Sequence, residues 1–576
     1  MCQAMQELLA KILSAWGERS EQERELVARA FAYAAAAHSP QKRASGEPYL
    51  VHPAGTAATL AKMGLDAPTL AAALLHDVVD DTPKTNDDIK RDFGDEIALL
   101  VAGVTKLGKI KYRGAKGKTE AGIQRQAENL RKMFLAMAED IRVVLIKLAD
   151  RLHNMETLKA LPERKQNRIA LETLDIYAPL AGRLGIGELK AKLDDLAFHY
   201  VYPNEYNALI REVREAYAER DRYCEKIVPI VKKTLEDAGI KTLSIHARAK
   251  HYFSLWQKLQ RLGGELAKVH DLVALRIVVP TIADCYETLG VLHKHWKPLP
   301  GRIKDYIAVP KPNGYQSIHT TVFCEDGRIT EFQVRTPEMH AQAEYGIAAH
   351  WAYTEAGKSA VAVHNRFRWV EQLRDWQKEV SGTQEFLDTL KIDFFRDRIY
   401  VFTPKGEVLE LPEGATPIDF AYHVHSEIGD QAVGARVNDK FVGLDVPLAN
   451  GDVIEVLTQK GKKPSVKWLE IAKTTAARHH IRKSLREHGI EVAAPPPQPL
   501  RAEVALEAED RVGLAKDITT TVSRAGYNIV SLEGKGKGEG GDFHMIVTIA
   551  SRAELKKLLE RLKKVKGVLE VTGRIV

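Results

Sequence analysis

Residues Leu74 to Asp81 read LLHDVVDD, which combines helix-forming apolar residues with four ionisable side chains. On a helix, His76 and Asp80 are four residues apart, as are Asp77 and Asp81, so each pair shares one side of the helix. Ionisable groups that face an apolar helix bundle are costly to bury unless a cation neutralises them. Imidazole combined with carboxylates suits Mn²⁺, Fe²⁺ or Zn²⁺. The stretch therefore predicts a metal site held by helices, against the alternative of a polar cluster with surface salt bridges.

Two further stretches favour the metal site. His52 follows a Ser-Gly-Glu-Pro-Tyr segment at 45–49, and residues 147–155 (KLADRLHNM) form a helical stretch in which Asp150 and Asn154 are four apart. A His-Asp pair alone is a weak signal, since a second one stands at 270–271. The order His52, His76-Asp77, Asp150 is that of HD-type phosphohydrolases, in which three helices supply the ligands of one metal.

Longer motifs carry a more specific resemblance. Residues 43–49 (RASGEPY), 75–77 (LHD) and 147–155 resemble the hydrolase domain of the RelA/SpoT family, the long enzymes that make and destroy (p)ppGpp. The resemblance implies an all-α HD domain with Mn²⁺ held by His52, His76, Asp77 and Asp150. It implies that Asp80 and Asp81 position or activate the attacking water, and that the nucleotide is bound by Arg43, Asn154 and Thr157.

The chain departs from the family pattern at three positions. It has Asp80 where the family usually has Glu, Pro40 where it has Gly, and Ala44 where it has a basic residue. A carboxylate that is one methylene shorter can still orient water, but a misplacement near 1 Å can lower a rate by about 10²-fold. These departures bear on the rate of hydrolysis rather than on metal binding.

From about residue 240 the pattern becomes α+β. Short β-branched runs predict strands at Leu272–Val279, Tyr306–Val309, Ser317–Cys324 and Ile329–Arg335, with a hairpin at Asp326-Gly327. Cations gather in two clusters, one around Arg248, Lys250, Ser254 and Lys258 and the other around Lys304, Lys311 and Arg335, beside the acids Asp271 and Glu331. Phosphoryl-type transfer needs this mixture of carboxylates and cations. The alternative is a solvated, charged sheet face.

Residues 301–321 (GRIKDYIAVPKPNGYQSIHTT), 331–336 (EFQVRT) and 343–351 (AEYGIAAHW) resemble the synthetase domain of the same family. The resemblance implies a nucleotidyltransferase-like α+β domain that transfers the β,γ-pyrophosphate of ATP to the 3′-hydroxyl of GDP or GTP. It implies Mg²⁺ at Asp271 and Glu331, with Glu331 as the metal-linked or base carboxylate. The other implied roles are adenine binding by Arg248 and Arg276, phosphate binding by Lys250, Ser254, Lys258, Lys304 and Lys311, and guanine stacking by Tyr315 with Asn313 and His319 nearby.

The C-terminal part resembles two regulatory modules of that family. Residues 393–458, above all 419–430 (DFAYHVHSEIGD), resemble the β-grasp TGS domain, which implies a contact between His425 and uncharged tRNA on the ribosome. Residues 502–576 show the βαββαβ pattern of an ACT domain, which binds a small ligand or a partner in other proteins. The interval 459–499 has no cysteine, so we expect this chain to lack the zinc-finger module that full-length relatives commonly carry there.

Composition fits this division. The chain has 576 residues, of which 45% are hydrophobic and 28% charged, and its net charge is +7. Four scattered cysteines, no signal-peptide pattern and no long apolar run favour a cytoplasmic protein without a membrane partner. The predicted units are 1–195 (HD hydrolase), 196–355 (synthetase with connecting helices), 356–391 (helical linker), 392–458 (TGS), 459–499 (truncated helical region and Pro-rich linker) and 500–576 (ACT).

We therefore predict a bifunctional enzyme that makes (p)ppGpp from ATP and GDP or GTP and also hydrolyses it. Two alternatives stay open. One is a synthetase with a weakened hydrolase, and the other is a ribosome- or tRNA-binding regulator with vestigial catalytic domains.

Overall fold

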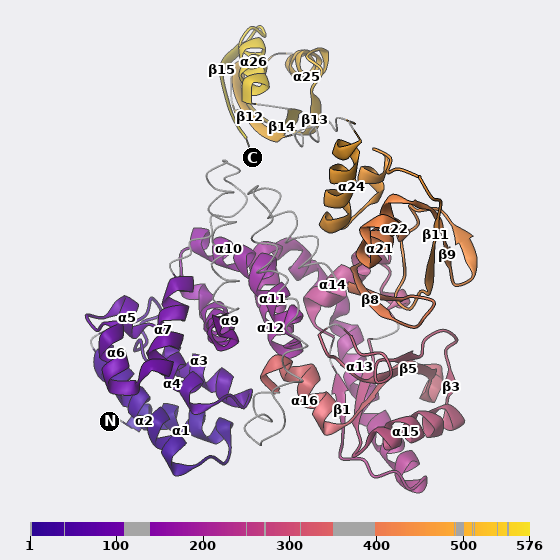
Figure 1. The fold of residues 1–576 in the computed structure, drawn as a ribbon. Coiled ribbons are helices and arrows are strands. Elements are labelled where there is room, and N and C mark those ends of the chain that lie inside the picture. Colours follow the sequence, from indigo (N-terminus) through magenta and orange to yellow (C-terminus); the bar gives the residue numbers. More distant parts are fainter. Residues whose placement is uncertain are drawn as a thin grey trace.

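The computed structural model describes most of the chain, as Figure 1 shows, with a helical N-terminal part, a mixed sheet domain and two smaller units after it. The described residues are 3–39, 41–108, 139–248, 250–269, 272–311, 313–349, 398–488, 490, 500–509, 511, 513–537, 540–549 and 552–575. The predicted helical linker 356–391 and the Pro-rich run 494–499 lie outside them.

Helices build the N-terminal part, as predicted. They are α1 (Gln3–Trp16), α2 (Glu21–Ala37), α3 (Val51–Lys62), α4 (Ala67–Leu75), α5 (Val78–Asp81), α6 (Asn86–Phe93), α7 (Asp95–Gly108), α9 (Ile141–Glu156), α10 (Glu163–Glu172), α11 (Ala178–Arg183) and α12 (Gly187–Val201). A 3₁₀ turn, Leu158–Ala160, follows α9, and a π-helical turn, Thr173–Tyr177, joins α10 to α11. α2 begins at a capping box formed by Ser20 and Glu23, a common N-terminal signal.

The LLHDVVDD stretch is not one continuous helix, which corrects the prediction. α4 ends at Leu75 and α5 begins at Val78, so His76 and Asp77 lie at the break between them. The Nδ1 atom of His76 lies 2.7 Å from the carbonyl oxygen of Ala73, which holds this ring against the end of α4. The break leaves Asp80 and Asp81 exposed on a separate turn.

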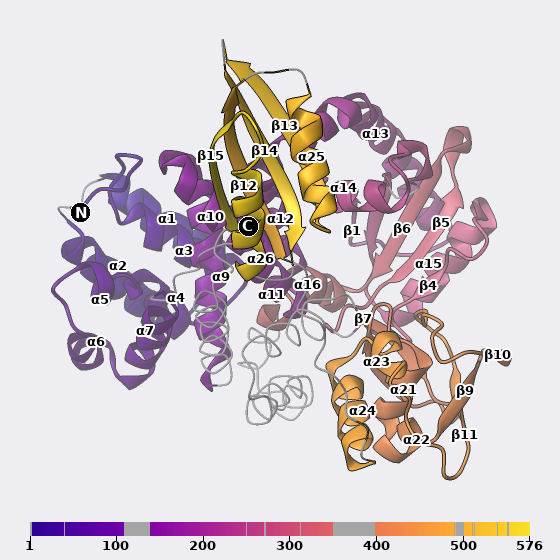
Figure 2. The same ribbon diagram turned by 90° about the horizontal axis from the view of Figure 1, so that it is seen from above.

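The long helix α13 (Pro203–Asp237) leads into a six-stranded sheet. The strands β1 (Ser244–Arg248), β2 (Ala274–Val278), β6 (Ile329–Arg335), β5 (Ile318–Phe323) and β3 (Lys297–Pro298) follow in that order, and β4 (Lys304–Asp305) pairs with β5. β2 and β6 are parallel and the other pairs antiparallel. The helices of this domain are α14 (Tyr252–Arg261), α15 (Ile282–His295) and α16 (Pro337–Tyr345), besides a 3₁₀ turn at Leu266–Lys268. α15 runs alongside β5 and β6 (Figure 2), and it encloses with α13 the apolar face of the sheet.

One predicted strand of this domain is wrong. Tyr306–Val309 forms a turn, because the Oδ1 atom of Asp305 accepts hydrogen bonds from the backbone N–H groups of Ile307 and Ala308, both at 2.9 Å. The other three predicted strands correspond to β2, β5 and β6. The hairpin between β5 and β6 turns at Asp326 and Gly327, whose φ angles of 58° and 69° match the positive values that tight hairpins require.

The strand-rich unit after residue 397 contains two small sheets. β7 (Arg398–Phe402) pairs with β8 (Val408–Pro412), and β10 (Lys440–Val442), β9 (Ala432–Val437) and β11 (Ile454–Thr458) form the other. Its helices are α21 (Pro417–Val424) and α22 (Ser426–Asp430), followed by α23 (Trp468–Ile471) and α24 (Thr475–Glu487). The buried carboxylate of Asp419 accepts hydrogen bonds from Thr416 and from the backbone N–H groups of Lys473 and Thr474, so it ties α21 to the start of α24.

The C-terminal unit has the predicted βαββαβ order. β12 (Leu500–Glu509), α25 (Leu514–Arg524), β13 (Asn528–Lys537), β14 (Gly540–Ile549), α26 (Arg552–Leu562) and β15 (Val568–Ile575) form a sheet in the order β13-β14-β12-β15 with two helices. The glycine-rich segment 534–541 belongs largely to β13 and β14, where Gly536 pairs with Gly541. Ladder pairing over long strands overrides the local preference of glycine for turns.

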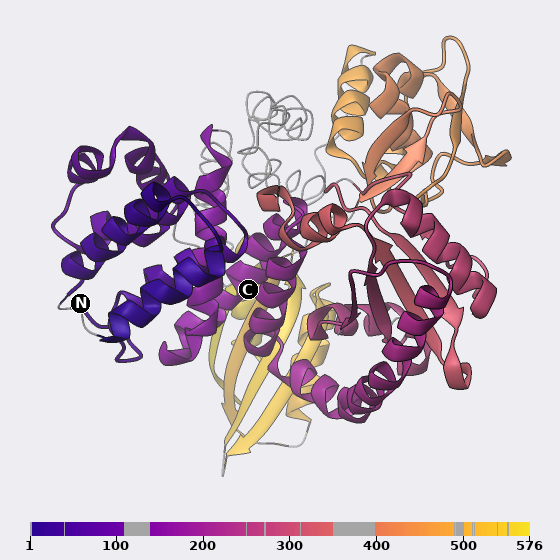
Figure 3. The same cartoon turned by 90° about the horizontal axis from the view of Figure 1, so that it is seen from below.

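The helical part and the sheet domain lie side by side and share packing through α12 (Figure 3). Ala348, which follows α16 in the sheet domain, is fully buried in the core of the helical part. In the described ranges, no helix combines the length and apolar character needed to cross a membrane.

Candidate active sites

The first site gathers side chains from three separate elements of the helical part. His52 lies in the first turn of α3, His76 at the end of α4, and Asp150 in the middle of α9. One ligand atom from each of these residues lies within 4.8 Å of the others, and all three side chains are buried. The group that the sequence order predicted is therefore assembled in space, and it can hold a divalent metal.

Contacts on the Nδ1 side orient both imidazole rings so that their Nε2 atoms lie near the carboxylates of this site. Arg43 can only donate, so the Nδ1 atom of His153, 3.1 Å from its Nη1, accepts. The Nδ1 atom of His52 lies 3.0 Å from the Nδ1 atom of His153, so the His153 ring packs against the side of the His52 ring that carries Nδ1. His76 donates from Nδ1 to the Ala73 carbonyl, and its buried Nε2 has no hydrogen-bond partner in the described structure. A carbonyl oxygen that accepts the proton of one ring nitrogen in this way orients a histidine ligand of a metal.

The carboxylates complete the donor set. Oδ1 of Asp150 lies 3.1 Å from the His52 Nε2, and Asp77 places one oxygen 3.2 Å from the His76 Nε2 and the other 3.5 Å from the His52 Nε2. Burial acts to raise the pKa of Asp150, but the Lys147 ammonium at 2.6 Å and then His52 outweigh it and hold that pKa well below its usual range. Imidazole nitrogens and carboxylate oxygens that converge in a buried space form a donor set that can hold a cation.

A network beside the metal group contains the predicted nucleotide-binding residues of this site. Arg43 donates to Asn154 at 2.8 Å and to Thr157 at 3.2 Å. Its third partner, His153, is neutral at pH 7, because burial, His52 and Arg43 lower its pKa to about 4. In the described part of the chain the hydrogen-bond partners of Arg43 therefore carry no negative charge, so its cation is available to an anionic ligand.

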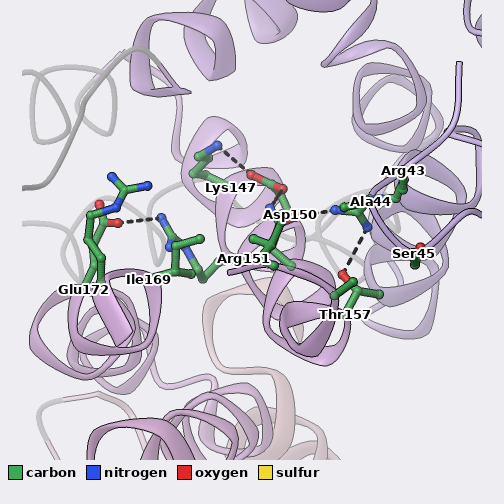
Figure 4. Close-up of a pocket in the computed structure, with 13 residues that line it drawn as sticks. Arg43, Ala44, Ser45, Lys147, Asp150, Arg151, Thr157, Ile169 and Glu172 are labelled. Carbon is green, nitrogen blue, oxygen red and sulfur yellow. Dashed lines mark hydrogen bonds and ion pairs between the residues drawn. The ribbon is translucent and has the colours of Figure 1, made fainter. Parts of the chain in front are cut away.

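A cavity of about 350 Å³ opens beside this network, as Figure 4 shows. Its lining residues are Arg43, Ala44, Ser45, Lys147, Asp150, Arg151, Asn154, Thr157, Ala160, Leu161, Arg168, Ile169 and Glu172. Arg151 forms an ion pair with Glu172 at 3.3 Å and stacks its guanidinium 4.1 Å from the ring centre of Tyr177. The size and the four cations suit a small ligand that carries phosphates.

Sequence reasoning missed several residues of this site. Tyr49 donates to Asp77 at 3.0 Å and also bonds Asp81, while Lys147 pairs with Asp150 and His153 links Arg43 to His52. Of these contacts, the sequence could have indicated only the Lys147–Asp150 pair, because residues three apart on a helix lie on the same side. Asp80 and Asp81 lie on the exposed turn of α5, and Pro40 is outside the described residues.

The second site lies on the polar face of the six-stranded sheet. Strand register aligns Arg248 of β1, Ala274 of β2 and Glu331 of β6 in one row. The next row contains His246, Arg276, Gln333, His319 and Lys304. Side chains two residues apart on a strand share a face, so five of the predicted synthetase residues come together here: Arg248, Arg276, Lys304, His319 and Glu331.

Glu331 is held from two sides. Gln333 donates to its Oε1 at 2.8 Å, and the Nδ1 of His319 lies 3.4 Å from the same oxygen. The Nε2 of His319 is 2.7 Å from the hydroxyl of Tyr315. Arg335 is fully buried, donates to Gln333 at 3.0 Å, and burial lowers its pKa to about 10. A fixed carboxylate surrounded by cations can bind a metal or accept a proton at a phosphate-binding surface.

The remaining predicted residues of the sheet domain surround this face. Arg276 forms an ion pair with Glu344 at 2.5 Å, and Lys311 places its ammonium 5.1 Å from the Tyr315 ring centre. Ser254 and Lys258 share one side of α14, and Lys250 and Asn313 lie in loops. Asp271 lies outside the described residues, so its role stays a prediction.

His425, predicted to contact tRNA, is exposed at the end of α21. Its Nδ1 atom accepts a hydrogen bond from the backbone N–H of Glu427 at 3.2 Å, which caps α22. The residue is exposed as a whole, so this capping role does not exclude a surface contact.

Four domain models match the chain. They describe an HD domain at residues 30–187, a region found in RelA/SpoT proteins at 247–358, a TGS domain at 399–458 and an ACT domain at 502–567. A probable guanosine-3′,5′-bis(diphosphate) 3′-pyrophosphohydrolase of Synechocystis sp. is 45% identical over 530 residues, which cover 89% of this chain and 68% of that protein.

The chain belongs to the RelA/SpoT family.

Two further RelA/SpoT relatives show how the chain compares in length. A GTP pyrophosphokinase of Myxococcus xanthus is 47% identical over 80% of this chain and 60% of its own length. A bifunctional (p)ppGpp synthase/hydrolase SpoT of Escherichia coli is 45% identical over 80% of this chain and 64% of its own length. The chain thus spans about three fifths to two thirds of these relatives. The matches confirm the predicted all-α HD, synthetase, TGS and ACT units, while the domain boundaries and residue roles stay predictions.

Proposed function

We propose that this chain both makes and hydrolyses (p)ppGpp, at two separate sites. The observation that carries the proposal is the buried group His52, His76 and Asp150 beside a cavity in which the hydrogen-bond partners of Arg43 among the described residues are neutral. The second support is the polar sheet face around Glu331, which lies in a different domain. RelA/SpoT relatives are named for each of the two activities, and one for both.

At the helical site, the reaction is ppGpp plus water to GDP plus pyrophosphate. His52, His76, Asp77 and Asp150 would hold the metal, proposed to be Mn²⁺. Such an ion lowers the pKa of a bound water and polarises the phosphate that is attacked. Arg43, Asn154 and Thr157 bind the nucleotide from the cavity side, and Asp80 and Asp81 orient the water.

At the sheet site, the 3′-hydroxyl of GDP or GTP attacks the β-phosphorus of ATP, which releases AMP. Glu331, fixed by Gln333 and His319, accepts the hydroxyl proton or holds Mg²⁺ together with Asp271. Arg248 and Arg276 bind adenine, and Tyr315 presents its ring to guanine. The phosphates are bound by Lys250, Ser254, Lys258, Lys304 and Lys311, and Asn313 and His319 complete the guanine side.

The two C-terminal modules would regulate these sites. The exposed position of His425 suits a contact with uncharged tRNA on the ribosome, and the ACT domain would bind a small ligand or a partner. The proposal includes no contact made through a zinc finger in the interval 459–499, because that interval has no cysteine.

The test incubates the purified chain with ATP, GDP and Mg²⁺, and separately with ppGpp and Mn²⁺, and separates the nucleotides by chromatography. The proposal expects ppGpp and AMP in the first reaction, and GDP and pyrophosphate in the second. Synthesis without hydrolysis would favour the weakened hydrolase. No turnover in either reaction, with or without ribosomes and tRNA, would favour the vestigial regulator.

A further inference from the structure

The helical part touches the second site through a turn that contains three glycines. This junction turn, residues 182–187, ends α11 and begins α12. It faces the nucleotide loop of the sheet domain, by which we mean Lys311, Asn313, Gly314 and Tyr315. A Cβ atom at Gly185 would lie 2.9 Å from the carbonyl oxygen of Asn313, where an ordinary contact is at least 3.4 Å. The two backbones therefore approach as closely as they do only because residue 185 has no side chain.

The end of α16 meets the same turn. The backbone N–H of Ile347 donates to the carbonyl oxygen of Leu184 at 3.0 Å. A Cβ at Gly346 would collide with that oxygen, and a Cβ at Gly187 would lie 2.8 Å from the carbonyl oxygen of Ala343. Ala348 continues this segment into the core of the helical part. The two parts therefore meet in a close backbone contact, which is held by the hydrogen bond between Ile347 and Leu184 and by the burial of Ala348.

The side chain of Asn313 joins the nucleotide loop to the junction turn. Its Oδ1 accepts from the backbone N–H of Tyr315 at 3.2 Å, and its Nδ2 points to the carbonyl oxygen of Gly182 at 3.5 Å. The backbone N–H of Lys311 donates to the carbonyl oxygen of Tyr315 at 3.0 Å, which closes the loop. A shift of Asn313 would therefore move the ring of Tyr315.

We propose that the junction turn of the helical part positions the nucleotide loop, so that guanine-nucleotide binding at the second site depends on Gly185 and Gly187, which lie outside that site. This inference rests on the proposed function, because it takes the ring of Tyr315 as the guanine platform. Displacements of a few tenths of an ångström at the turn reach Tyr315 through Asn313, and a misplacement near 1 Å can change a rate by about 10²-fold.

The chain supplies matched alanine substitutions for the test. Gly185→Ala adds both a backbone collision and an unfavourable φ of +78°. Gly187→Ala adds no φ strain and only a collision with the carbonyl oxygen of Ala343 in α16, at the same turn but not directly against the nucleotide loop. Gly239→Ala is the control, because its φ of +81° is equally unfavourable but nothing lies within 4 Å of the added Cβ. Comparison of the three separates backbone strain from displacement of the loop.

The experiment measures the KM for GDP and for ATP during synthesis by the full chain, and the amide hydrogen exchange of the nucleotide loop. We expect Gly185→Ala to raise the KM for GDP by about 10-fold or more while the KM for ATP changes by less than about 3-fold, with a smaller effect from Gly187→Ala. Loop exchange should accelerate in the same order and stay unchanged in Gly239→Ala.

Two results would overturn the inference: equal changes in both KM values, or a Gly185→Ala variant that behaves like Gly239→Ala. If the unaltered chain makes no product from ATP and GDP, the proposed function fails, and loop exchange still decides the positioning. Equal loop exchange in the Gly185 and Gly239 variants would then refute the inference by itself. If Gly185→Ala does not fold, Gly187→Ala, which adds no backbone strain, is compared with Gly239→Ala in its place.

Discussion

Replacement of Lys147 by Met tests the electrostatics of the first site. Met keeps much of the aliphatic length of Lys but removes the charge 2.6 Å from Asp150. The pair is nearly enclosed, with 15% of the Lys147 side chain and 5% of the Asp150 side chain exposed. Burial acts to lower the pKa of Lys147, but Asp150 outweighs it and raises that pKa. The variant thus leaves a buried carboxylate without its closest cation.

The size of the effect follows from this burial. Removal of one partner from a buried ion pair lowers the free energy of unfolding by about 3–5 kcal/mol. For a unit of 150–250 residues, 1 kcal/mol shifts Tm by about 2–4 °C, so Lys147→Met should lower the Tm of the helical part by about 6–20 °C. A divalent cation held by His52, His76 and Asp150 would replace the missing charge, so Mn²⁺ should recover part of this loss.

Calorimetry in EDTA and in Mn²⁺ measures both effects. The control is Lys232→Met, because Lys232 pairs with Glu236 at 3.7 Å with more than half of each side chain exposed, and such a pair is worth at most about 1 kcal/mol. The reasoning is refuted if Lys147→Met in EDTA is no less stable than this control. It is equally refuted if Mn²⁺ stabilises the variant no more than it stabilises the unaltered chain.

Three further predictions address other parts of the molecule. Gly55→Ala would drive a Cβ into the His153 ring, so hydrolysis should fall by about 10²-fold with synthesis unchanged, and unchanged hydrolysis would contradict this. Tyr315→Leu removes a stacking surface worth about 1–3 kcal/mol, so the KM for GDP should rise about 5–150-fold in synthesis assays, and an unaltered KM would argue against guanine stacking. Arg183 pairs with Glu410 at 2.8 Å between α11 and β8, so a double-mutant cycle with alanine at both positions should show a coupling of about 0.5–3 kcal/mol in unfolding experiments, whereas strict additivity would show that the pair contributes nothing.

The sequence predicted the fold best where hydrophobic periodicity and pairing agree. The strands corresponding to β5 and β6, the hairpin between them and the βαββαβ order of the last unit follow from alternation and turn residues. The prediction from sequence failed where a side-chain hydrogen bond or a tertiary contact outweighs the local sequence pattern. The carboxylate of Asp305 converts a β-branched run into a turn, and strand pairing extends through the glycines of β13 and β14.

The metal group was predictable because its motif residues stand in a recognisable order, but its geometry was not. The LLHDVVDD pattern reads as one helix, yet α4 ends at Leu75 and α5 begins at Val78, with His76 and Asp77 between them, near His52 and Asp150. The role of His153 in fixing the His52 ring depends on residues 101 positions apart, which no local pattern can show. The contact of Gly185 with Asn313 is likewise visible only in three dimensions.

The central claim is that two separate sites catalyse opposed reactions. The most direct measurement compares Glu331→Gln and Asp77→Ala, each assayed for synthesis from ATP and GDP and for hydrolysis of ppGpp. Glu331→Gln should abolish synthesis and spare hydrolysis, because Glu331 lies on the sheet face, and Asp77→Ala should do the reverse, because Asp77 lies beside the buried histidines. Loss of both activities in both variants would contradict the two-site account.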